Sequence, residues 1–428
     1  MASSGPLEQG VAPREVFGWA MYDFANSGYT TVVITAVFNA YFVATVAGNA
    51  PWATFAWTAA LSLSYAAIMA SAPLVGAWAD ARAAKKRLLA ATTAGCVLGT
   101  AALGFVGPGE VALGIALIAL SNFFFGSGEN IVAAFLPELA RDGSLGRVSG
   151  WGWGLGYLGG LVSLAACLAW VTGAQERGES AASFVPVTML ITAAIFALAS
   201  LPTFLLLRER AVAQPRTGGA LAAAYARVAG TLRDAGRFRD LRRFLVCLVF
   251  YQAGVQAVIA LAAIYAEQAI GFTTRDSILL ILAVNLTAAA GALAFGYVQD
   301  RIGHLPTIAI TLAGWILTVL LAYAAGGRPL FWVAANLAGL CLGASQSAGR
   351  ALVGYLSPAD RRAEFFGLWG FAVKLSSILG PLTYGAATWI SGGNHRMAML
   401  ITGAYFVIGL ALLAGVDLRR GREAALGG

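Results

Sequence analysis

The stretch GAWADARAAKKR (residues 76–87) is a short polar loop between two long apolar runs, and it decides how the rest of the chain is interpreted. A related stretch, GYVQDRIGH (residues 296–304), ends another apolar run, so that Asp80 and Asp300 lie 220 residues apart. Pro137 and Pro358, which each end an apolar run, are 221 residues apart. Because the same features return after half a chain, the sequence predicts two copies of one unit in the same orientation.

The amino-acid composition is typical of a membrane protein. Of the 428 residues, 59% are hydrophobic and only 11% are charged, with a mean hydropathy of +0.75. Soluble domains carry roughly 25% charged residues, so a soluble enzyme, a nucleic-acid-binding module and a disordered chain are excluded. A transmembrane helix needs about 20 apolar residues. Twelve runs of that kind predict an all-α membrane protein with twelve transmembrane helices: 17–46, 53–79, 88–107, 111–139, 148–172, 184–207, 243–270, 277–299, 306–325, 330–356, 365–391 and 397–416.

The basic residues predict the topology. The even-numbered loops and both tails hold 22 Lys and Arg, whereas the opposite side holds 4. The positive-inside rule therefore predicts that both termini lie in the cytoplasm. The expected location is an integral, multi-pass position in the membrane, which in a bacterium is the inner membrane. The organisation expected is a six-helix bundle over 1–207, a cytoplasmic amphipathic linker over 208–242 and a second bundle over 243–428. In the linker, apolar residues recur at helical spacing, namely Leu221, Tyr225, Val228 and Leu232. No charged and then apolar leader precedes the first run, so no cleaved signal peptide is expected.

Four ionisable residues lie inside the predicted helices: Asp23, Glu129, Arg350 and Lys374. Each costs about 2.5–3.5 kcal/mol at a helix centre, so each is expected to be paired or functional. All four fall roughly 9–15 Å inside the inner boundary of the bilayer core. The first half supplies both acids and the second half both bases, which allows ion pairs across the cleft between the halves.

Two interpretations of these charges stay open. In one, the pairs hold the cytoplasmic side shut without touching substrate. In the other, Asp23 or Glu129 carries a proton while Arg350 or Lys374 holds a carboxylate or another anion. A purely structural role is the third possibility. Five amides could bind substrate or join helices to one another; they are Asn26, Asn130, Gln252, Gln256 and Gln346.

The two polar loops predict contacts that close the cytoplasmic side. Asp80, at a helix end, can meet a neighbouring helix terminus or a cation, and Asp300 lies in the second, weaker copy of the same loop. The basic residues beside them are expected to steady those contacts; they are Arg82, Lys85, Arg87 and Arg301. Gly152, Gly156 and Gly160 share one helix face, which predicts close helix packing in preference to a dinucleotide site.

No cofactor, metal site or catalytic group is expected. The four cysteines lie singly within apolar runs, His304 and His395 are at loop positions, and no phosphate-binding loop of the Walker type occurs. An intramembrane enzyme would need a nucleophile with a base or a metal cluster, and these residues do not supply one.

The spacing of the two loops resembles the cytoplasmic-loop signature of the major facilitator superfamily. Further motifs resemble its vacuole-effluxer-like branch. They are Asp23-Phe24-Ala25-Asn26-Ser27, Leu136-Pro137-Glu138, Gly156-Tyr157-Leu158-Gly159-Gly160, Gln346 to Arg350, Glu364-Phe365-Phe366-Gly367, Lys374 and Gly380-Pro381. The resemblance covers essentially the whole chain and implies a twelve-helix secondary transporter working by alternating access. Fungal members export amino acids from the vacuole. The chain departs from the pattern at Val132 and Ala133, where relatives often carry Tyr-Asn, and at Gly349 and Ala351, which replace serines.

The sequence thus predicts a proton-linked or facilitative transporter of a small polar organic solute, with amino acids as the first expectation. Its expected partners are this solute, protons and the lipid bilayer, and it is expected to be a monomer that binds no nucleic acid. Two alternatives are a membrane receptor or scaffold that does not transport, and a lipid or lysolipid flippase.

Overall fold

The computed structural model describes residues 5–213 and 237–427, and leaves some side chains between 260 and 278 undescribed. Over these residues the chain is helical apart from turns and one isolated bridge between Leu7 and Ala140. Among the described residues, twelve helices are long and apolar enough to cross a membrane. The prediction of an all-α protein with twelve spanning helices is confirmed.

The helices follow one another through short connections. The first half contains α1 (Pro13–Tyr29), the π-helical η1 (Thr30–Ala36), α2 (Phe38–Tyr41), the π-helical η2 (Phe42–Val46), α3 (Ala53–Arg82), α4 (Lys85–Ala102), η3 (Leu103–Phe105), α5 (Val111–Ala133), α6 (Leu136–Leu139), η4 (Asp142–Ser144), α7 (Leu145–Glu176) and α8 (Ala181–Leu206). The second half contains α10 (Arg239–Ile270), α11 (Thr274–Ile302), α12 (His304–Ala324), α13 (Arg328–Leu356), α14 (Arg362–Ile390), α15 (His395–Leu413) and α16 (Leu418–Leu426).

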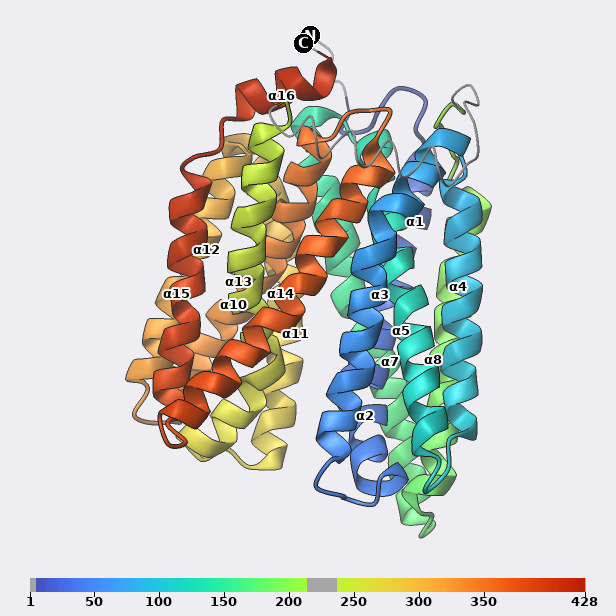
Figure 1. Cartoon of the computed structure of the whole chain (residues 1–428), viewed down its shortest axis with the longest axis vertical. Helices are drawn as coiled ribbons and strands as arrows, with labels where there is room; N and C mark the ends of the chain where they lie inside the picture. The colour runs from blue at the N-terminus through green and yellow to red at the C-terminus, as the bar shows by residue number, and fades with distance from the viewer. Residues whose placement is uncertain (1–4, 214–236, 428) are drawn as a thin grey trace.

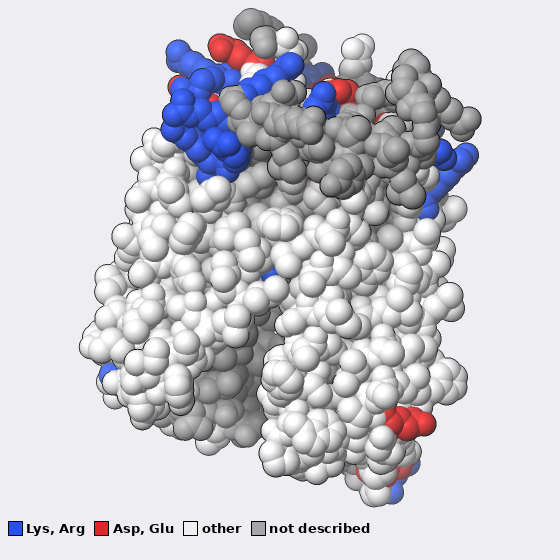
Figure 2. All heavy atoms as spheres, viewed as in Figure 1, with Lys and Arg blue, Asp and Glu red and all other residues white. Residues whose placement is uncertain are grey.

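The two halves stand side by side as separate bundles, and the described chain begins and finishes at the same end of the molecule (Figure 1). We call this the terminal end and the opposite one the far end. Figure 2 shows charged side chains gathered at the terminal end, a few at the far end, and an almost uncharged belt between them. Such a belt is the surface that a bilayer core requires. The same view shows the surface hollowed between the halves toward the far end.

The first span departs from the single continuous helix predicted over 17–46. It changes to π-helix at Thr30–Ala36 and again at Phe42–Val46. A π-turn accommodates an extra residue without ending a helix, so composition alone cannot reveal it. Packing fixes it here: Phe42 lies against Trp57, with ring centroids 5.6 Å apart, and the Tyr41 hydroxyl donates to the Val106 carbonyl at 3.0 Å.

Both polar loops owe their turns to one residue in the left-handed region. Ala83 (φ 50°) ends α3, and Gly303 (φ 96°) separates α11 from α12. Glycine takes this conformation freely, whereas alanine does so at some cost. The glycines that lie on one face of α7 pack as predicted, because a Cβ at Gly156 would touch Ser27 of α1 and a Cβ at Gly160 would touch Thr31 of η1.

The predicted amphipathic linker lies mostly outside the described residues, including Leu221, Tyr225, Val228 and Leu232. Its described beginning is held to the first half. The Glu209 carboxylate accepts from the backbone N–H of Lys85 at 3.1 Å and of Lys86 at 2.8 Å, and thereby caps the start of α4. Arg210 pairs with Glu15 at 2.8 Å.

Candidate transport site

The first buried ion pair joins α1 to α13, and it is saturated with partners. The Arg350 guanidinium bonds to Asp23 Oδ2 at 2.7 Å, and donates to the hydroxyl of Ser149 at 3.1 Å and to its carbonyl at 2.8 Å. The guanidinium also lies over the Trp19 ring at 4.7 Å and the Trp153 ring at 5.3 Å. The side chains of Arg350 and Asp23 are 3% and 12% exposed. Little of the guanidinium is left for another ligand.

The second buried pair joins α5 to α14 and is more open. Lys374 Nζ lies 3.1 Å from Glu129 Oε2, and the side chains are 8% and 22% exposed. The ammonium has three donors, and in the described part of the chain this is the one hydrogen bond that it makes. The rings of Tyr65 and Phe125 each lie 5.6 Å from it. Two donors of Lys374 are therefore available to a ligand.

The four intramembrane charges are thus brought together as two separate pairs across the halves. Each pair takes its acid from the first half and its base from the second, as the sequence predicted. Neither pair could be assigned from sequence, because the partner of each acid depends on how the helices are rotated. Trp19, Trp153 and Ser149, which surround Arg350, gave no sequence signal beyond lying in apolar or glycine-rich runs.

The predicted amides divide into two groups. Gln252 on α10 donates to Gln346 on α13 at 2.6 Å, which joins two helices of the second half. Asn26 Oδ1 and both amide atoms of Asn130 are buried without a partner among the described residues, and Gln256 is half-buried. Buried polar atoms without partners mark places where water or a ligand completes the hydrogen bonding. Asn26 follows the first pair on α1 by one turn, and Asn130 is next to the second pair on α5.

At the terminal end, the Asp80 carboxylate crosses from the first half to the second. It accepts from the backbone N–H of Ala363 at 3.1 Å and of Glu364 at 2.9 Å, at the start of α14. The beginning of a helix is partly positive and has unused N–H groups, so a carboxylate there stabilises it. Gly76 permits this approach, since a Cβ would overlap the Ala363 carbonyl. The predicted contact of Asp80 with a helix terminus is the one observed.

Asp300 makes the reciprocal contact, from the second half to the first. Its carboxylate accepts from the N–H of Gly146 at 2.9 Å and of Arg147 at 3.3 Å, at the start of α7. It also pairs with the Arg147 side chain at 2.6 Å. Asp300 therefore meets both a helix terminus and a cation. The two carboxylates fasten each half to a helix of the other.

The basic residues that neighbour Asp80 and Asp300 in the sequence have other contacts or are exposed. Lys85 is buried and pairs with Glu138, which belongs to the same half. Arg82 lies over Trp78 of its own helix at 5.0 Å. Arg87 and Arg301 are exposed. The contacts between the halves that we can assign to the two loops are made by the carboxylates, whereas the role predicted for these cations stays a prediction.

The C-terminal helix α16 adds a connection that the sequence analysis missed. Arg420 pairs with Asp240 of α10 at 2.6 Å. Arg422 donates to the Tyr355 carbonyl at 2.8 Å and pairs with Asp142 of the first half. The arginines there were interpreted only as a topology signal, although Asp417, which caps α16, offered a helix-start signal.

Twelve spans in the described residues, in two halves fastened at one end and hollowed between them toward the other, have the fold of the major facilitator superfamily. Solved structures of the superfamily superpose on this chain. The crystal structure of the human organic anion transporter MFSD10 (TETRAN) matches with a TM-score of 0.73 at 14% identity, over 94% of this chain and 100% of that one. The E. coli fucose:proton symporter FucP matches with a TM-score of 0.70 at 15% identity, over 94% and 97%.

Within the superfamily, residues 52–426 match the family described as "Vacuole effluxer Atg22 like", and the chain belongs to it. An uncharacterized MFS-type transporter of Bacillus subtilis, YxiO, is 26% identical over 408 residues, which is 93% of this chain and 94% of that protein. Autophagy-related protein 22-1 of Aspergillus fumigatus is 23% identical over 332 residues, 70% of this chain and 54% of that protein. The chain is therefore an integral membrane protein that transports by alternating access.

Proposed function

We propose that this protein is a proton-coupled carrier of small organic solutes that bear a carboxylate, with amino acids as the first candidates. The observation that carries the proposal is the Glu129–Lys374 pair. It joins the two halves inside the membrane, yet it leaves two ammonium donors of Lys374 unused. An intramembrane ion pair with spare donors suits a site at which one carboxylate replaces another.

Exchange of carboxylates links the solute to the proton. While Glu129 is ionised, it occupies Lys374 and opposes the approach of a second anion. When Glu129 takes up a proton, its attraction for the ammonium falls and a solute carboxylate can bind Lys374 instead. For a solute whose only charge is its carboxylate, the net charge of the site is the same before and after the exchange, so the loaded carrier does not have to move an extra charge through lipid. A zwitterionic amino acid adds the positive charge of its ammonium group, which is the charge of the proton taken up by Glu129.

The first pair suits a different task. Arg350 is held by Asp23, by Ser149 and by two indole rings, so a solute would have to displace several contacts at once. We assign to it the positioning of α1, α7 and α13 around the site. The orphaned amide atoms of Asn26 and Asn130 are the candidates for contacts to the polar part of the solute.

The proposal includes an orientation of the protein in the membrane. The terminal end, with its excess of Lys and Arg, faces the cytoplasm, in agreement with the positive-inside rule. The contacts of Asp80 and Asp300 then close the cytoplasmic side, and the hollow seen in Figure 2 opens outward. The carrier works as a monomer, because each chain contains both halves and the whole site.

Transport by the purified protein in proteoliposomes that contain a pH-sensitive dye tests the proposal. We expect addition of an amino-acid mixture to move protons with the wild-type protein. Glu129→Gln should abolish this coupled proton movement and retain exchange of labelled solute for unlabelled solute, since exchange needs no net proton transfer. Glu176→Gln is the matched control, because that glutamate is exposed and distant in sequence from the site.

Full gradient-driven uptake by Glu129→Gln would refute the assignment of the proton. Binding of solute without any counterflow would favour a receptor or scaffold. Movement of a fluorescent lysophospholipid, with no response to amino acids, would favour a flippase.

A further inference from the structure

The terminal end carries a second cluster of positive charge that the transport site does not use. It surrounds a pocket with a volume of about 490 Å³, formed by the start of α10, the turn between α13 and α14, the first residue of α14 and the end of α16. Its described lining includes four arginines and one carboxylate, namely Arg237, Arg361, Arg362, Arg422 and Asp360. We call it the arginine pocket.

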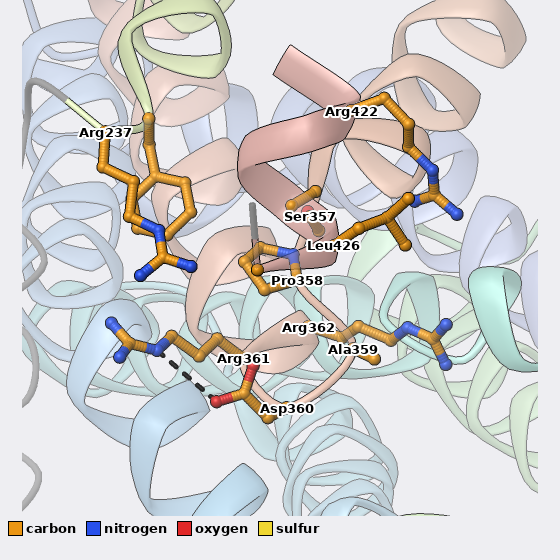
Figure 3. Close-up of a pocket in the computed structure, with 12 residues that line it drawn as sticks. Arg237, Ser357, Pro358, Ala359, Asp360, Arg361, Arg362, Arg422 and Leu426 are labelled. Atoms are coloured by element: carbon orange, nitrogen blue, oxygen red, sulfur yellow. Dashed lines mark ion pairs between the residues drawn. The ribbon is translucent and has the colours of Figure 1, made fainter. Parts of the chain in front are cut away.

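The guanidinium groups lie in two pairs on opposite sides of the pocket. Figure 3 shows Arg237 and Arg361 on one side, where Arg361 pairs with Asp360 at 3.6 Å, and Arg362 and Arg422 on the other side. Four arginines against one carboxylate leave the lining with an excess of positive charge, which a bound anion would offset. Arginine is the side chain best suited to phosphate, because its planar fork binds two oxygens at once.

Two further details indicate a site for a ligand. Arg362 Nε is buried without a hydrogen-bond partner in the described part of the chain, although buried donors are nearly always paired. Arg422 is held in place from outside the pocket by the Tyr355 carbonyl and by Asp142. One arginine is therefore fixed in advance, while a donor of another still lacks an acceptor.

The size of the pocket sets the class of ligand. Sites for small molecules have volumes of about 300–1,000 Å³, so there is room for more than a lone phosphate ion. We propose that the arginine pocket binds a phosphate-bearing anion at the terminal end, either a phosphorylated metabolite or the headgroup of an anionic lipid. The proposal is independent of the transported solute. Since Arg422 also bonds to Asp142, the anion lies beside a contact between the two halves.

Thermal unfolding of the purified full-length protein tests this site. The probe is inorganic pyrophosphate, added in rising concentration at constant ionic strength so that screening does not change. We expect a saturable rise of the unfolding midpoint, because a ligand that binds the folded state stabilises it. Loss of one arginine–phosphate contact should weaken the apparent affinity by about tenfold.

The variants are Arg362→Gln, which removes the unpartnered donor, and Arg237→Gln, which changes an exposed side chain and so preserves the fold. Arg242→Gln is the matched control, since this exposed arginine of α10 does not line the pocket. A second arm compares nanodiscs of phosphatidylcholine with nanodiscs that also contain phosphatidylglycerol.

A pyrophosphate response that weakens in both pocket variants and not in the control supports a soluble anion. Stabilisation seen only with phosphatidylglycerol, and lost in both pocket variants, supports a lipid headgroup. The proposal is overturned if neither probe stabilises the protein, or if the control variant weakens the response as much as the pocket variants do.

Discussion

Both intramembrane ion pairs join a carboxylate to a cation, and they differ in how many hydrogen bonds the cation makes. Asp23–Arg350 has three hydrogen bonds from one guanidinium and two indole rings beside it. Glu129–Lys374 has one hydrogen bond and a more exposed carboxylate. The difference follows from the cation, because arginine offers five fixed donors and lysine a rotatable point charge. The comparison teaches that an ion pair across the halves can hold the halves together or can be a site where a ligand replaces the carboxylate. Which of the two it is depends on how many donors of the cation are unused.

The strongest way to break this comparison is to remove each base in turn. Arg350→Gln should lower the free energy of unfolding by about 3–5 kcal/mol, because Asp23 is left buried and uncompensated. Lys374→Gln should cost only about 1–2 kcal/mol, since Glu129 is 22% exposed and can be hydrated. Denaturant titration of the detergent-solubilised protein, followed by tryptophan fluorescence, measures both. Equal losses would remove the distinction between the pairs.

A steric test sharpens the comparison, because a glycine of the first half packs against each pair. A Cβ at Gly152 would overlap Asp23 Oδ2 and lie 2.6 Å from Arg350 Nη2. A Cβ at Gly126 would lie 2.6 Å from Ile68 Cδ1 and 3.1 Å from Lys374 Cε, which are both near the ends of flexible side chains. Gly152→Ala should cost about 1–3 kcal/mol, as overpacking does, and Gly126→Ala less. The readout is the same titration, and a greater loss in Gly126→Ala would contradict the expected order.

The smallest change removes one contact of the saturated pair. Ser149→Ala deletes the hydroxyl that accepts from Arg350 Nε at 3.1 Å and donates to the Ser347 carbonyl at 2.9 Å, and it keeps the contact of Arg350 with the Ser149 carbonyl. We expect a loss of about 1–3 kcal/mol, typical of two hydrogen bonds, with proton-coupled transport retained. Ser71→Ala is the control, because that hydroxyl bonds only within its own helix among the described residues. Loss of coupling in Ser149→Ala alone would mean that the first pair takes part in proton transfer.

Much of the fold follows from the sequence. Runs of about 20 apolar residues can satisfy their backbone only as helices in lipid, so the number of spans is fixed by hydropathy. The helix ends were predicted less well, since α7 begins at Leu145 and ends at Glu176, beyond both limits of its apolar run. The π-helical turns at Thr30–Ala36 and Phe42–Val46 could not be predicted, because side-chain packing selects them.

The charged residues of the site were predicted from the sequence, whereas the two ion pairs that they form were not. Charges are costly inside a membrane, and this cost alone singled out Asp23, Glu129, Arg350 and Lys374. Their partners depend on helix rotation and side-chain reach, which hydropathy does not contain. The same limit applies at the terminal end, where Asp300 was predicted only to steady the closed cytoplasmic side, and its partners, the start of α7 and the Arg147 side chain, were not predicted.

The reciprocal carboxylates have a consequence for how substitutions act. Asp80 completes a helix that begins more than 280 residues further along the chain, and Asp300 completes one that begins more than 150 residues before it. A substitution in either loop therefore acts first on the other bundle. An isolated half would lack the carboxylate that completes its own helix, so the effect of either loop is visible only in the intact chain.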